Sequence, residues 1–439
     1  MNQKKEMRRR QFLKNSTMVI LGGGGILSHA SQMKSEEKDK SGPPKINAYR
    51  VLGRTGFKVS DISIGHMANL EILNALLDTG ANYIDTAESY GRGRDEITIG
   101  KAIKNRDRKS IFITSKLSLK KKFTKQGLVA RTHKCLERLQ TDYIDCMMIH
   151  AASDIKTIKA QEFHEAMTQL KSEGKVRYVG LSNHGSNWAD DPKESMEKIL
   201  LAAASDGRFD VMLLAYNFMA REMGEKVLKA CAEKNIGTTL MKTNPVGLYH
   251  EIKNTVDGMQ KEGKDVSEFY TKLLAKLKAK SAKAENFMKQ YNLINPKDIR
   301  DATVRFVLNN PHVNTVCFTY NTFDDVESYI KLSGSRYSEL DERKLVAYTK
   351  GCDNLYCRHA CGLCEPHCPY KVQINTIMRY NHYFEAQGRE KHAMSHYAQL
   401  PTAKADRCHN CEGFCEAACP FNIPIQGLLI LAHRKLTLA

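Results

Sequence analysis

The chain has 439 residues, more than the roughly 100–200 residues of a single domain, so the length predicts at least two domains. Its composition, with 42% hydrophobic and 26% charged residues, is that of a globular protein. The formal net charge of +18 allows contact with nucleic acid, anionic lipid or anionic substrates without choosing among them. Aromatic and basic residues are not interleaved in any stretch, so we expect no nucleic-acid partner.

Residues 1–30 have the pattern of an export signal. Residues 8–14 are RRRQFLK, a short apolar run follows, and residues 28–30, SHA, offer small side chains for cleavage. This segment resembles a twin-arginine signal peptide with Arg9 and Arg10 as the pair, although a disordered basic tail is the alternative. The run is short and rich in glycine, so we expect no integral membrane span after cleavage. Residues 31–46, rich in Lys, Glu, Ser and Pro, are typical of a linker.

Residues 47–336 alternate short apolar runs with amphipathic stretches. Helical periods cover residues 71–79, 162–172 and 225–234. The runs expected to be strands are 62–65, 83–85, 111–116, 143–150, 176–182, 211–216, 238–242 and 315–318. Eight strand-then-helix units predict an α/β fold with a parallel sheet, most simply a closed (β/α)8 TIM barrel. Functional residues of such barrels gather where the strands end.

Four ionisable residues stand at or just beyond the ends of successive predicted strands. They are Asp85, Tyr90, Lys116 and His150. Any one of them alone is more often structural, because a lone strand-end lysine is usually solvated and a lone histidine usually has satisfied hydrogen bonds. Four at one rim indicate proton transfer. A lysine cation favours the phenolate of a tyrosine whose free pKa is about 10, an aspartate holds that lysine, and a histidine orients a carbonyl oxygen.

The motifs in this region resemble those of the aldo/keto reductase superfamily. VLGRTGFKVS, YIDTAESYG, FITSK, DYIDCMMIH and GLSN follow one another in the family's order across residues 48–335. The resemblance implies that Tyr90 is the general acid/base and that Asp85, Lys116 and His150 complete a catalytic tetrad. It also implies a hairpin around residues 52–59 that closes the bottom of the barrel.

By the same resemblance, a nicotinamide nucleotide, NADP or NAD, is the expected cofactor. Ser182 and Asn183 would hold the carboxamide and Tyr216 would stack on the ring. The match weakens after the eighth strand, in TVCFTYNTFDDVESYI, where the family usually has a proline–glycine turn and cations for a 2′-phosphate. Asp324 and Asp325 would repel such a phosphate, or they merely complement a helix dipole. The choice between NAD and NADP stays open.

Two basic segments border the predicted barrel. Residues 116–134 carry seven Lys or Arg and no acid, which would attract an anionic substrate or form a solvated helix face. Residues 251–293 form an insertion, of which 267–288 has the pattern of one long basic amphipathic helix. This helix would serve as a lid over the site or meet a partner.

Residues 337–439 hold two groups of four cysteines, CRHACGLCEPHCP and CHNCEGFCEAACP. Thiols this close in sequence strain disulfides between neighbours but can converge on one inorganic core, and a closing Cys-Pro is typical of bacterial [4Fe–4S] sites. Two clusters are therefore the leading interpretation; a single cluster, zinc or disulfides are the alternatives. The expected ligands are Cys357, Cys361, Cys364, Cys368, Cys408, Cys411, Cys415 and Cys419.

The pattern resembles the α-helical ferredoxin module, with a helix over residues 374–385 between the groups. That resemblance implies that Cys419 joins the first three cysteines of the first group on one cluster, and that Cys368 joins the second group on the other. Cys352 stays unassigned. Four further cysteines lie in helix or strand patterns and are expected in the core: Cys135, Cys146, Cys231 and Cys317.

The signal and the clusters support each other, because cluster binding is coupled to folding and the twin-arginine route moves folded proteins. We therefore expect a periplasmic oxidoreductase that interconverts a small-molecule carbonyl and an alcohol, with sugar-derived compounds as one candidate class, and exchanges electrons with an unknown redox partner. A cytoplasmic reductase is the alternative location. The alternative function is an iron–sulfur electron-transfer or binding subunit in which the barrel is a non-catalytic scaffold.

Overall fold

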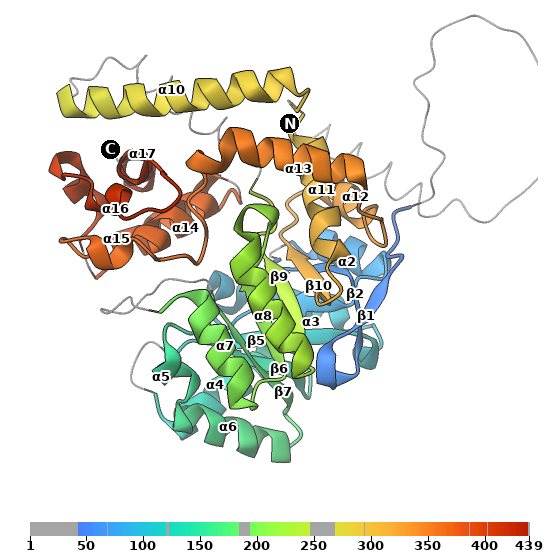
Figure 1. The fold of residues 1–439 in the computed structure, drawn as a ribbon. Helices are drawn as coiled ribbons and strands as arrows, with labels where there is room; N and C mark the ends of the chain where they lie inside the picture. The colour runs from blue at the N-terminus through green and yellow to red at the C-terminus, as the bar shows by residue number, and fades with distance from the viewer. Residues whose placement is uncertain are drawn as a thin grey trace, which may run out of the picture.

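The computed structural model describes residues 43–437 except 68, 120–122, 184–193, 246–267, 294, 386 and 402. The expected signal peptide and most of the expected linker lie outside these residues. Figure 1 shows a barrel with a group of helices from the C-terminal part of the chain beside it.

The eight strands predicted from the apolar runs form one closed parallel barrel, which confirms the predicted α/β TIM barrel. The last strand closes the ring by pairing in parallel with both the first and the seventh. In order along the chain the strands are β3 (Ile62–Ile64), β4 (Tyr83–Asp85), β5 (Phe112–Leu117), β6 (Ile144–Ile149), β7 (Val176–Ser182), β8 (Val211–Ala215), β9 (Gly237–Met241) and β10 (Thr315–Phe318).

Helices follow the strands and cover the outside of the barrel. They are α2 (Leu70–Asp78), α3 (Arg94–Ile103), α4 (Lys125–Leu139), α5 (Ile155–Ile158), α6 (Gln161–Ser172), α7 (Met196–Asp206), α8 (Arg221–Glu233), α11 (Pro296–Asn309) and α12 (Phe323–Ile330). The first and second predicted helical periods agree with α2 and α6 to within a residue. Helix α8 begins four residues before its predicted start, directly after a 3-10 turn that the Asn217 side chain caps.

A short antiparallel hairpin of β1 (Tyr49–Val51) and β2 (Lys58–Ser60) precedes the barrel. Leu52 and Val59 are fully buried and pack with residues such as Tyr83 and Phe112, which point into the barrel. Strand side chains alternate between two faces, so one set fills the barrel and the other packs against the helices. The hairpin thus closes one end, as predicted, and leaves the other end for a site.

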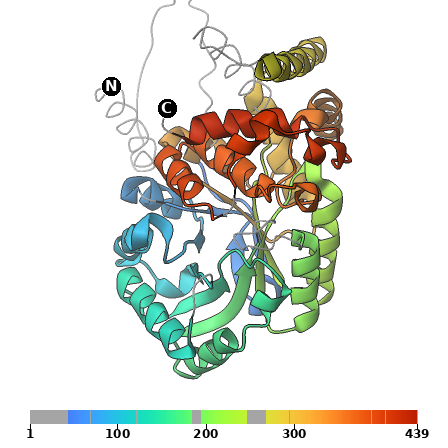
Figure 2. The same ribbon diagram turned by 90° about the vertical axis from the view of Figure 1, so that its left-hand side faces the viewer.

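The C-terminal part is helical, as expected. It contains α13 (Glu339–Cys352), α14 (Ile374–Glu385), α15 (Glu390–Ala398), α16 (Phe414–Ala417) and α17 (Ile425–Leu436). Helix α14 packs against α15 and α17, and α13 packs against α11 of the barrel. Arg305 of α11 binds Asp341 of α13, with 2.7 Å between Nη2 and Oδ1, which ties the two parts together. In Figure 2 the C-terminal helices lie across one end of the barrel.

The long helix predicted in the insertion is present as α10 (Glu268–Gln290). It packs against α13 and α17 and lies along the C-terminal helices (Figure 1). The Lys276 ammonium is 2.8 Å from a carboxylate oxygen of Glu416, and Lys280 donates to the carbonyl of Asn422. The described helix therefore covers the cysteine-rich part, and it lines neither of the two cavities at the barrel end described below.

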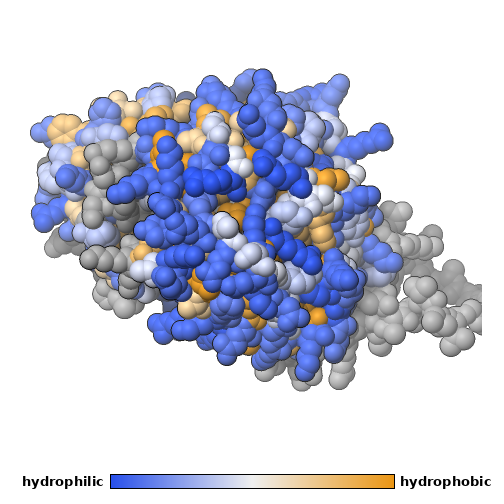
Figure 3. Space-filling model, turned by 90° about the horizontal axis from the view of Figure 1, so that it is seen from below, coloured by the Kyte–Doolittle hydropathy of each residue, from blue (hydrophilic) through white to orange (hydrophobic). Residues whose placement is uncertain are grey.

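The face seen from below is mostly hydrophilic, with only small scattered apolar areas among its described residues (Figure 3). No helix within the described ranges combines the length and the apolar character that a membrane crossing needs.

Candidate active site and cysteine cluster

The site begins with a buried ion pair at the open end of the barrel. Asp85 ends β4 and Lys116 stands near the end of β5, so the pairing of these neighbouring strands brings the two side chains together. The Lys116 ammonium donates to Asp85 Oδ2 at 2.6 Å and to the Thr86 carbonyl at 2.7 Å. Burial opposes the charge of Lys116, but Asp85 and Tyr90 together raise the pKa of Lys116 above its ordinary value. The pair therefore stays ionised and fixes a cation inside the barrel mouth.

Tyr90 reaches this pair because the chain turns sharply after it. Gly91, Arg92 and Gly93 all have left-handed backbone, with φ of 57°, 59° and 88°. Glycine adopts this region without strain, which accounts for the two glycines in the YGRG turn. The turn ends at the start of α3 and leaves the Tyr90 ring over the end of the barrel.

The four residues predicted as a tetrad meet around the Tyr90 ring. The Lys116 ammonium is 5.1 Å from the centre of the Tyr90 ring, and the ring of His150 is 5.6 Å from it, edge to face. Burial raises the pKa of Tyr90 to about 12, with Lys116 opposing that rise and Asp85 adding to it. Tyr90 is therefore a neutral phenol at ordinary pH, which can donate a proton to an oxygen atom.

His66 is a neighbour of Tyr90 that sequence reasoning missed. Its ring lies 5.1 Å from the Tyr90 ring, and its Nδ1 is 3.0 Å from Asp95 Oδ1. It follows the strand β3 at the same rim as the four predicted residues. The strand-end rule that selected Asp85 and Lys116 would have found it.

A cavity of about 860 Å³ opens over Tyr90 and His150, between the barrel and the C-terminal helices. The barrel contributes the lower wall, and α14, α15 and the turn between them contribute the upper wall. The lining residues are Ser89, Tyr90, Gly91, Arg92, Arg94, Ser118, His150, Ala151, Tyr383, Arg389, Lys391, His392, Ser395, His396 and Gln399. The cysteine-rich part therefore forms half of the candidate substrate site.

A second, smaller cavity of about 170 Å³ also touches Tyr90 and lies toward β9 and β10. Lys242, just after β9, lines it, and its ammonium is buried without a hydrogen-bond partner. Burial, with the charge of Arg379 adding to it, lowers the pKa of Lys242 well below its ordinary value. An anion bound beside this buried amine would favour its protonated form, so Lys242 fits a negatively charged ligand group.

Ser182 and Asn183 lie at the end of β7 as predicted, but neither lines either cavity. The Ser182 hydroxyl accepts from the Ala151 backbone N–H at 2.9 Å, and the Asn183 amide donates to the Ala152 carbonyl at 2.7 Å. Both side chains thus fix the loop after His150, at the edge of the larger cavity.

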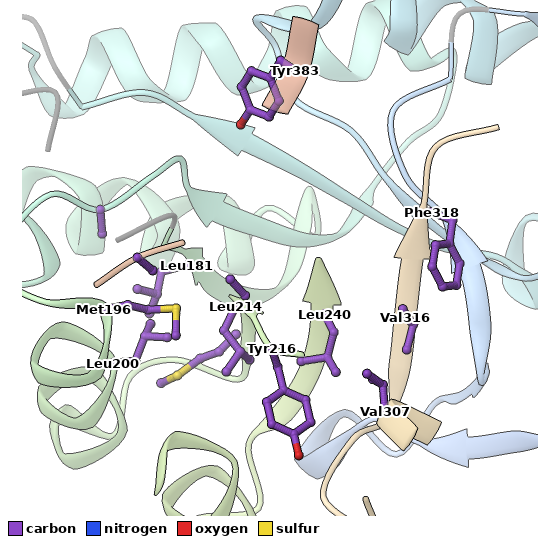
Figure 4. Close-up of a cluster of buried hydrophobic side chains, with 14 of the residues drawn as sticks. Leu181, Met196, Leu200, Leu214, Tyr216, Leu240, Val307, Val316, Phe318 and Tyr383 are labelled. Carbon is purple, nitrogen blue, oxygen red and sulfur yellow. The ribbon is translucent and has the colours of Figure 1, made fainter. Parts of the chain in front are cut away.

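The structure corrects the position expected for Tyr216. Its ring packs against Phe306 of α11, 5.6 Å between centres, and its hydroxyl contacts Glu225 and Asn310. Figure 4 shows it in the buried cluster with Leu214. The reason is strand alternation: residues 211 and 213 point into the barrel, so 212, 214 and 216 point outward. In this structure Tyr216 is not placed to stack on a ring in the cavity.

The acidic residues after the eighth strand have a structural role. The Asp325 carboxylate accepts from the backbone N–H groups of Asn321 and Thr322 at 2.9 Å, and the Thr322 hydroxyl accepts from the Asp325 N–H at 3.1 Å. This is a complete capping box at the start of α12. Of the two explanations for Asp325, the structure therefore supports the helix cap.

The first group of cysteines surrounds a small cavity together with one cysteine of the second group. Its lining includes Cys357, Cys361, Cys364 and Cys419. Among the described residues no disulfide forms, so all thirteen cysteines are free. Within those residues, no set of three or more His, Cys, Asp or Glu side chains has the geometry to hold a single metal ion.

The remaining four cysteines gather nearby. Burial raises the pKa of the Cys408 thiol, and the thiols of Cys415, Cys368 and Cys411 add to that rise because they lie close to it. Cys415 also raises the pKa of Cys364, so the two groups are neighbours. The structure thus places Cys419 with the first group and Cys368 with the second. Cys352 is buried at the end of α13.

Residues 51–342 match the protein family described as the aldo/keto reductase family. The match spans well over half of the chain. The chain belongs to the aldo/keto reductase family.

Among curated relatives, aldo-keto reductase YhdN of Bacillus subtilis is 30% identical over 213 residues, which cover 44% of this chain and 60% of YhdN. The oxidoreductase YqkF of the same organism is 34% identical over 150 residues, which cover 30% of this chain and 48% of YqkF. The chain therefore spans less than two thirds of the length of these two aldo/keto reductase relatives.

Two solved aldo/keto reductase structures match the chain in part. Aldo-keto reductase AKR11C1 from Bacillus halodurans, in its holo form, has a TM-score of 0.49 and 18% identity, covering 70% of this chain and 96% of its own. An aldo-keto reductase from Klebsiella pneumoniae in complex with NADPH has a TM-score of 0.48 and 21% identity, covering 69% of this chain and 94% of its own.

Proposed function

We propose that the protein is an oxidoreductase that interconverts a carbonyl and an alcohol at Tyr90. The observation that carries this proposal is the phenol of Tyr90 flanked by the Asp85–Lys116 pair and by His150 at the floor of an 860 Å³ cavity. In the direction of reduction, Tyr90 gives its proton to the carbonyl oxygen as that oxygen becomes negative. Lys116 stabilises the phenolate that remains, and His150 orients the oxygen.

We propose that a nicotinamide nucleotide binds in the smaller cavity beside Tyr90. A bound nicotinamide nucleotide supplies the hydride, two electrons and one proton together, to the carbonyl carbon. The buried, unpartnered amine of Lys242, which a neighbouring anion would keep protonated, fits a phosphate group of such a cofactor. The Klebsiella pneumoniae relative was solved with NADPH, which supports the same cofactor class.

We propose that the eight cysteines of the C-terminal part hold two [4Fe–4S] clusters. The support is the spacing of the thiols and their gathering into two neighbouring sets of four without a disulfide among them. Each cluster would pass one electron at a time, so a group that splits the two electrons of a hydride would be needed between the nucleotide and the clusters. The redox partner that exchanges these electrons would meet the cysteine-rich part.

We propose that the protein is exported by the twin-arginine route and works in the periplasm, since folded export preserves the clusters. Replacing Arg9 and Arg10 by lysines tests this location. The substituted protein should stay in the cytoplasmic fraction with its iron content unchanged. Retention of the unsubstituted chain in the cytoplasmic fraction would contradict the proposal and support the cytoplasmic alternative. Equal export of the two chains would contradict the twin-arginine route.

A second function has one observation in its favour. Tyr216 is packed in the core and Ser182 and Asn183 are bound to backbone, so the three residues expected at the nucleotide line neither cavity. This placement of the three side chains is expected for an electron-transfer subunit whose barrel is a scaffold and binds no nucleotide. Mass spectrometry of small molecules released from the anaerobically purified protein separates the two. Stoichiometric NADP(H) or NAD(H) supports the enzyme, and absence of any nucleotide binding by calorimetry supports the scaffold.

The catalytic role of Tyr90 is tested by Tyr90→Phe, which removes the hydroxyl and keeps the ring. Turnover should fall by about 10²–10⁴-fold while iron and sulfide stay unchanged. Tyr383→Phe is the matched control, because Tyr383 also lines both cavities but has no Lys116 beside it. Turnover that survives Tyr90→Phe would overturn the proposed chemistry.

A further inference from the structure

We infer that the large cavity selects an organic anion, specifically a polyhydroxylated carboxylate of the sugar-acid class. This inference rests on the proposed carbonyl–alcohol chemistry at Tyr90 and names the substrate class of that site. Three features of the cavity carry it: its charge, the position of one arginine and the polarity of its walls.

The charge of the cavity has one sign. Arg92 and Arg94 come from the turn after Tyr90, and Arg389 and Lys391 come from the start of α15. None of the fifteen described lining residues is an aspartate or glutamate. Two carboxylates of the barrel rim are already paired, Asp85 with Lys116 and Glu88 with Arg131. A cavity whose described lining has four permanent cations and no acid attracts a negatively charged ligand.

Arg389 is a cation of the cavity lining that lies against the Tyr90 ring. Its guanidinium carbon is 5.8 Å from the centre of the Tyr90 ring and 5.4 Å from that of Tyr383. It is half-buried, and no carboxylate of the described part of the chain pairs with it. A guanidinium presents a planar fork that matches the two oxygens of a carboxylate. A carboxylate bound there would lie beside Tyr90, which places the neighbouring carbons of the substrate near the phenol.

Polar groups are spread through the lining of the cavity, although carbon atoms make up most of its wall surface. Among the lining residues only Gly91 and Ala151 lack a polar group in the side chain. Ser89, Ser118 and Gln399 offer hydrogen bonds without charge. Such walls suit a ligand with many hydroxyl groups, and the volume of about 860 Å³ leaves room for a sugar-sized molecule or a larger one.

The test measures binding, by calorimetry, of matched ligand pairs to the anaerobically purified full-length protein. The pairs are the methyl glycosides of a hexose and of the corresponding hexuronate, which differ only in the carboxylate. The unsubstituted protein should bind the hexuronate about tenfold more tightly, or better. Arg389→Gln should reduce that preference to nearly none while leaving hexose binding unchanged, and Arg389→Lys should restore part of it.

Arg343→Gln is the control for net charge, since Arg343 lies on α13 outside the cavity and its side chain is 76% exposed. This variant should keep the full preference. Equal binding of the two glycosides, a preference that survives Arg389→Gln, or one that Arg343→Gln also removes would each overturn the inference. Tighter binding of the hexose 6-phosphate than of the hexuronate would also overturn it, in favour of a phosphate ligand.

The failure of this inference is distinguishable from failure of the proposed chemistry. Tyr90→Phe should keep the preference for the hexuronate, because the hydroxyl is not the anion ligand, while turnover is lost. A Tyr90→Phe protein that binds the hexuronate selectively and still turns over would overturn the chemistry alone.

Discussion

At the scale of single residues, the site depends on one buried ion pair. Asp85 and Lys116 are both removed from water at the barrel mouth, and the ammonium also binds the Thr86 carbonyl. A buried pair of this kind adds little net stability, but removal of one partner leaves the other charge uncompensated. The pair is better explained as a fixed cation beside Tyr90 than as a device for stability.

Lys116→Met should therefore lower both activity and stability. The free energy of unfolding at neutral pH should fall by about 3–5 kcal/mol, because Asp85 loses its cation. Burial already raises the pKa of Asp85, and Lys116 is the first group that opposes this rise. In the variant the pKa of Asp85 is higher still, so the folded state gains a proton more readily than the unfolded state. Stability should then recover as pH falls from 7 to 4.

Denaturant unfolding at several pH values measures this effect. Lys101→Met is the control, because Lys101 is an exposed residue of α3 and its loss removes the same charge. A Lys116→Met protein whose stability deficit does not shrink in acid would show that Asp85 is not the destabilising group.

The pH dependence of turnover tests the state of Tyr90. With a pKa raised to about 12 by burial, the phenol stays protonated through the neutral range. The rate of carbonyl reduction by Tyr90 should therefore show no alkaline decline between about pH 6 and pH 9, since the proton donor is lost only as pH rises through its pKa. A decline in kcat centred near pH 8 would show that another group donates the proton.

Single residues were predictable where chain order alone fixes their place. All strands of a parallel barrel end at the same rim, in the order in which they follow along the chain. Asp85, Lys116 and His150 could therefore be placed from the sequence. Tyr216 was misplaced because the resemblance took precedence over the two-residue alternation of its own strand. Arg389 could not be found, since nothing in the sequence indicates that a residue of α15 meets Tyr90.

At the scale of elements, the start of helix α12 had two interpretations in the sequence, and its geometry decides between them. From the sequence, Asp325 could either repel a phosphate by its negative charge or cap a helix. Its hydrogen bonds in the structure are those of a helix cap. The strands were predictable from their apolar periods. The packing of α14 and α15 over the barrel mouth was not, because it joins segments about 300 residues apart through side chains with no shared motif.

Thr322→Ala should destabilise α12 through loss of its N-cap. The hydroxyl that accepts from the Asp325 N–H disappears, which typically costs about 1 kcal/mol. Thermal unfolding should show a lower Tm, and Thr322→Ser, which keeps the hydroxyl, should show almost none of the change. If both variants lose stability equally, the threonine methyl group and not the cap is the source.

At the scale of the whole molecule, the cysteine-rich part both lines the cavity over Tyr90 and carries the two sets of thiols. Its helices α14 and α15 form the upper wall of the cavity over Tyr90, and its thiols gather on the side covered by α10. Substrate binding and the proposed clusters thus share one small helical body. Loss of the clusters should loosen this body and with it the cavity, because metal binding and folding are coupled.

Pairs of cysteine substitutions test how the thiols are shared between the clusters. The geometry places Cys419 with Cys357, and Cys368 with the second group. Each complete cluster contributes four irons, so the unsubstituted protein should hold about eight per chain. Cys357→Ser with Cys419→Ser should leave about four, since both changes affect one cluster. Cys357→Ser with Cys368→Ser should leave almost none, since each change affects a different cluster.

If each run of cysteines held its own cluster, the two results would be exchanged, so the iron content of the anaerobically purified double variants decides between the arrangements. Cys352→Ser, which changes the buried thiol at the end of α13, should retain all the iron. Electron paramagnetic resonance of the reduced proteins adds a second reading. The Cys357/Cys419 variant should keep the signal of one isolated cluster, because the neighbouring cluster with which it would couple is gone.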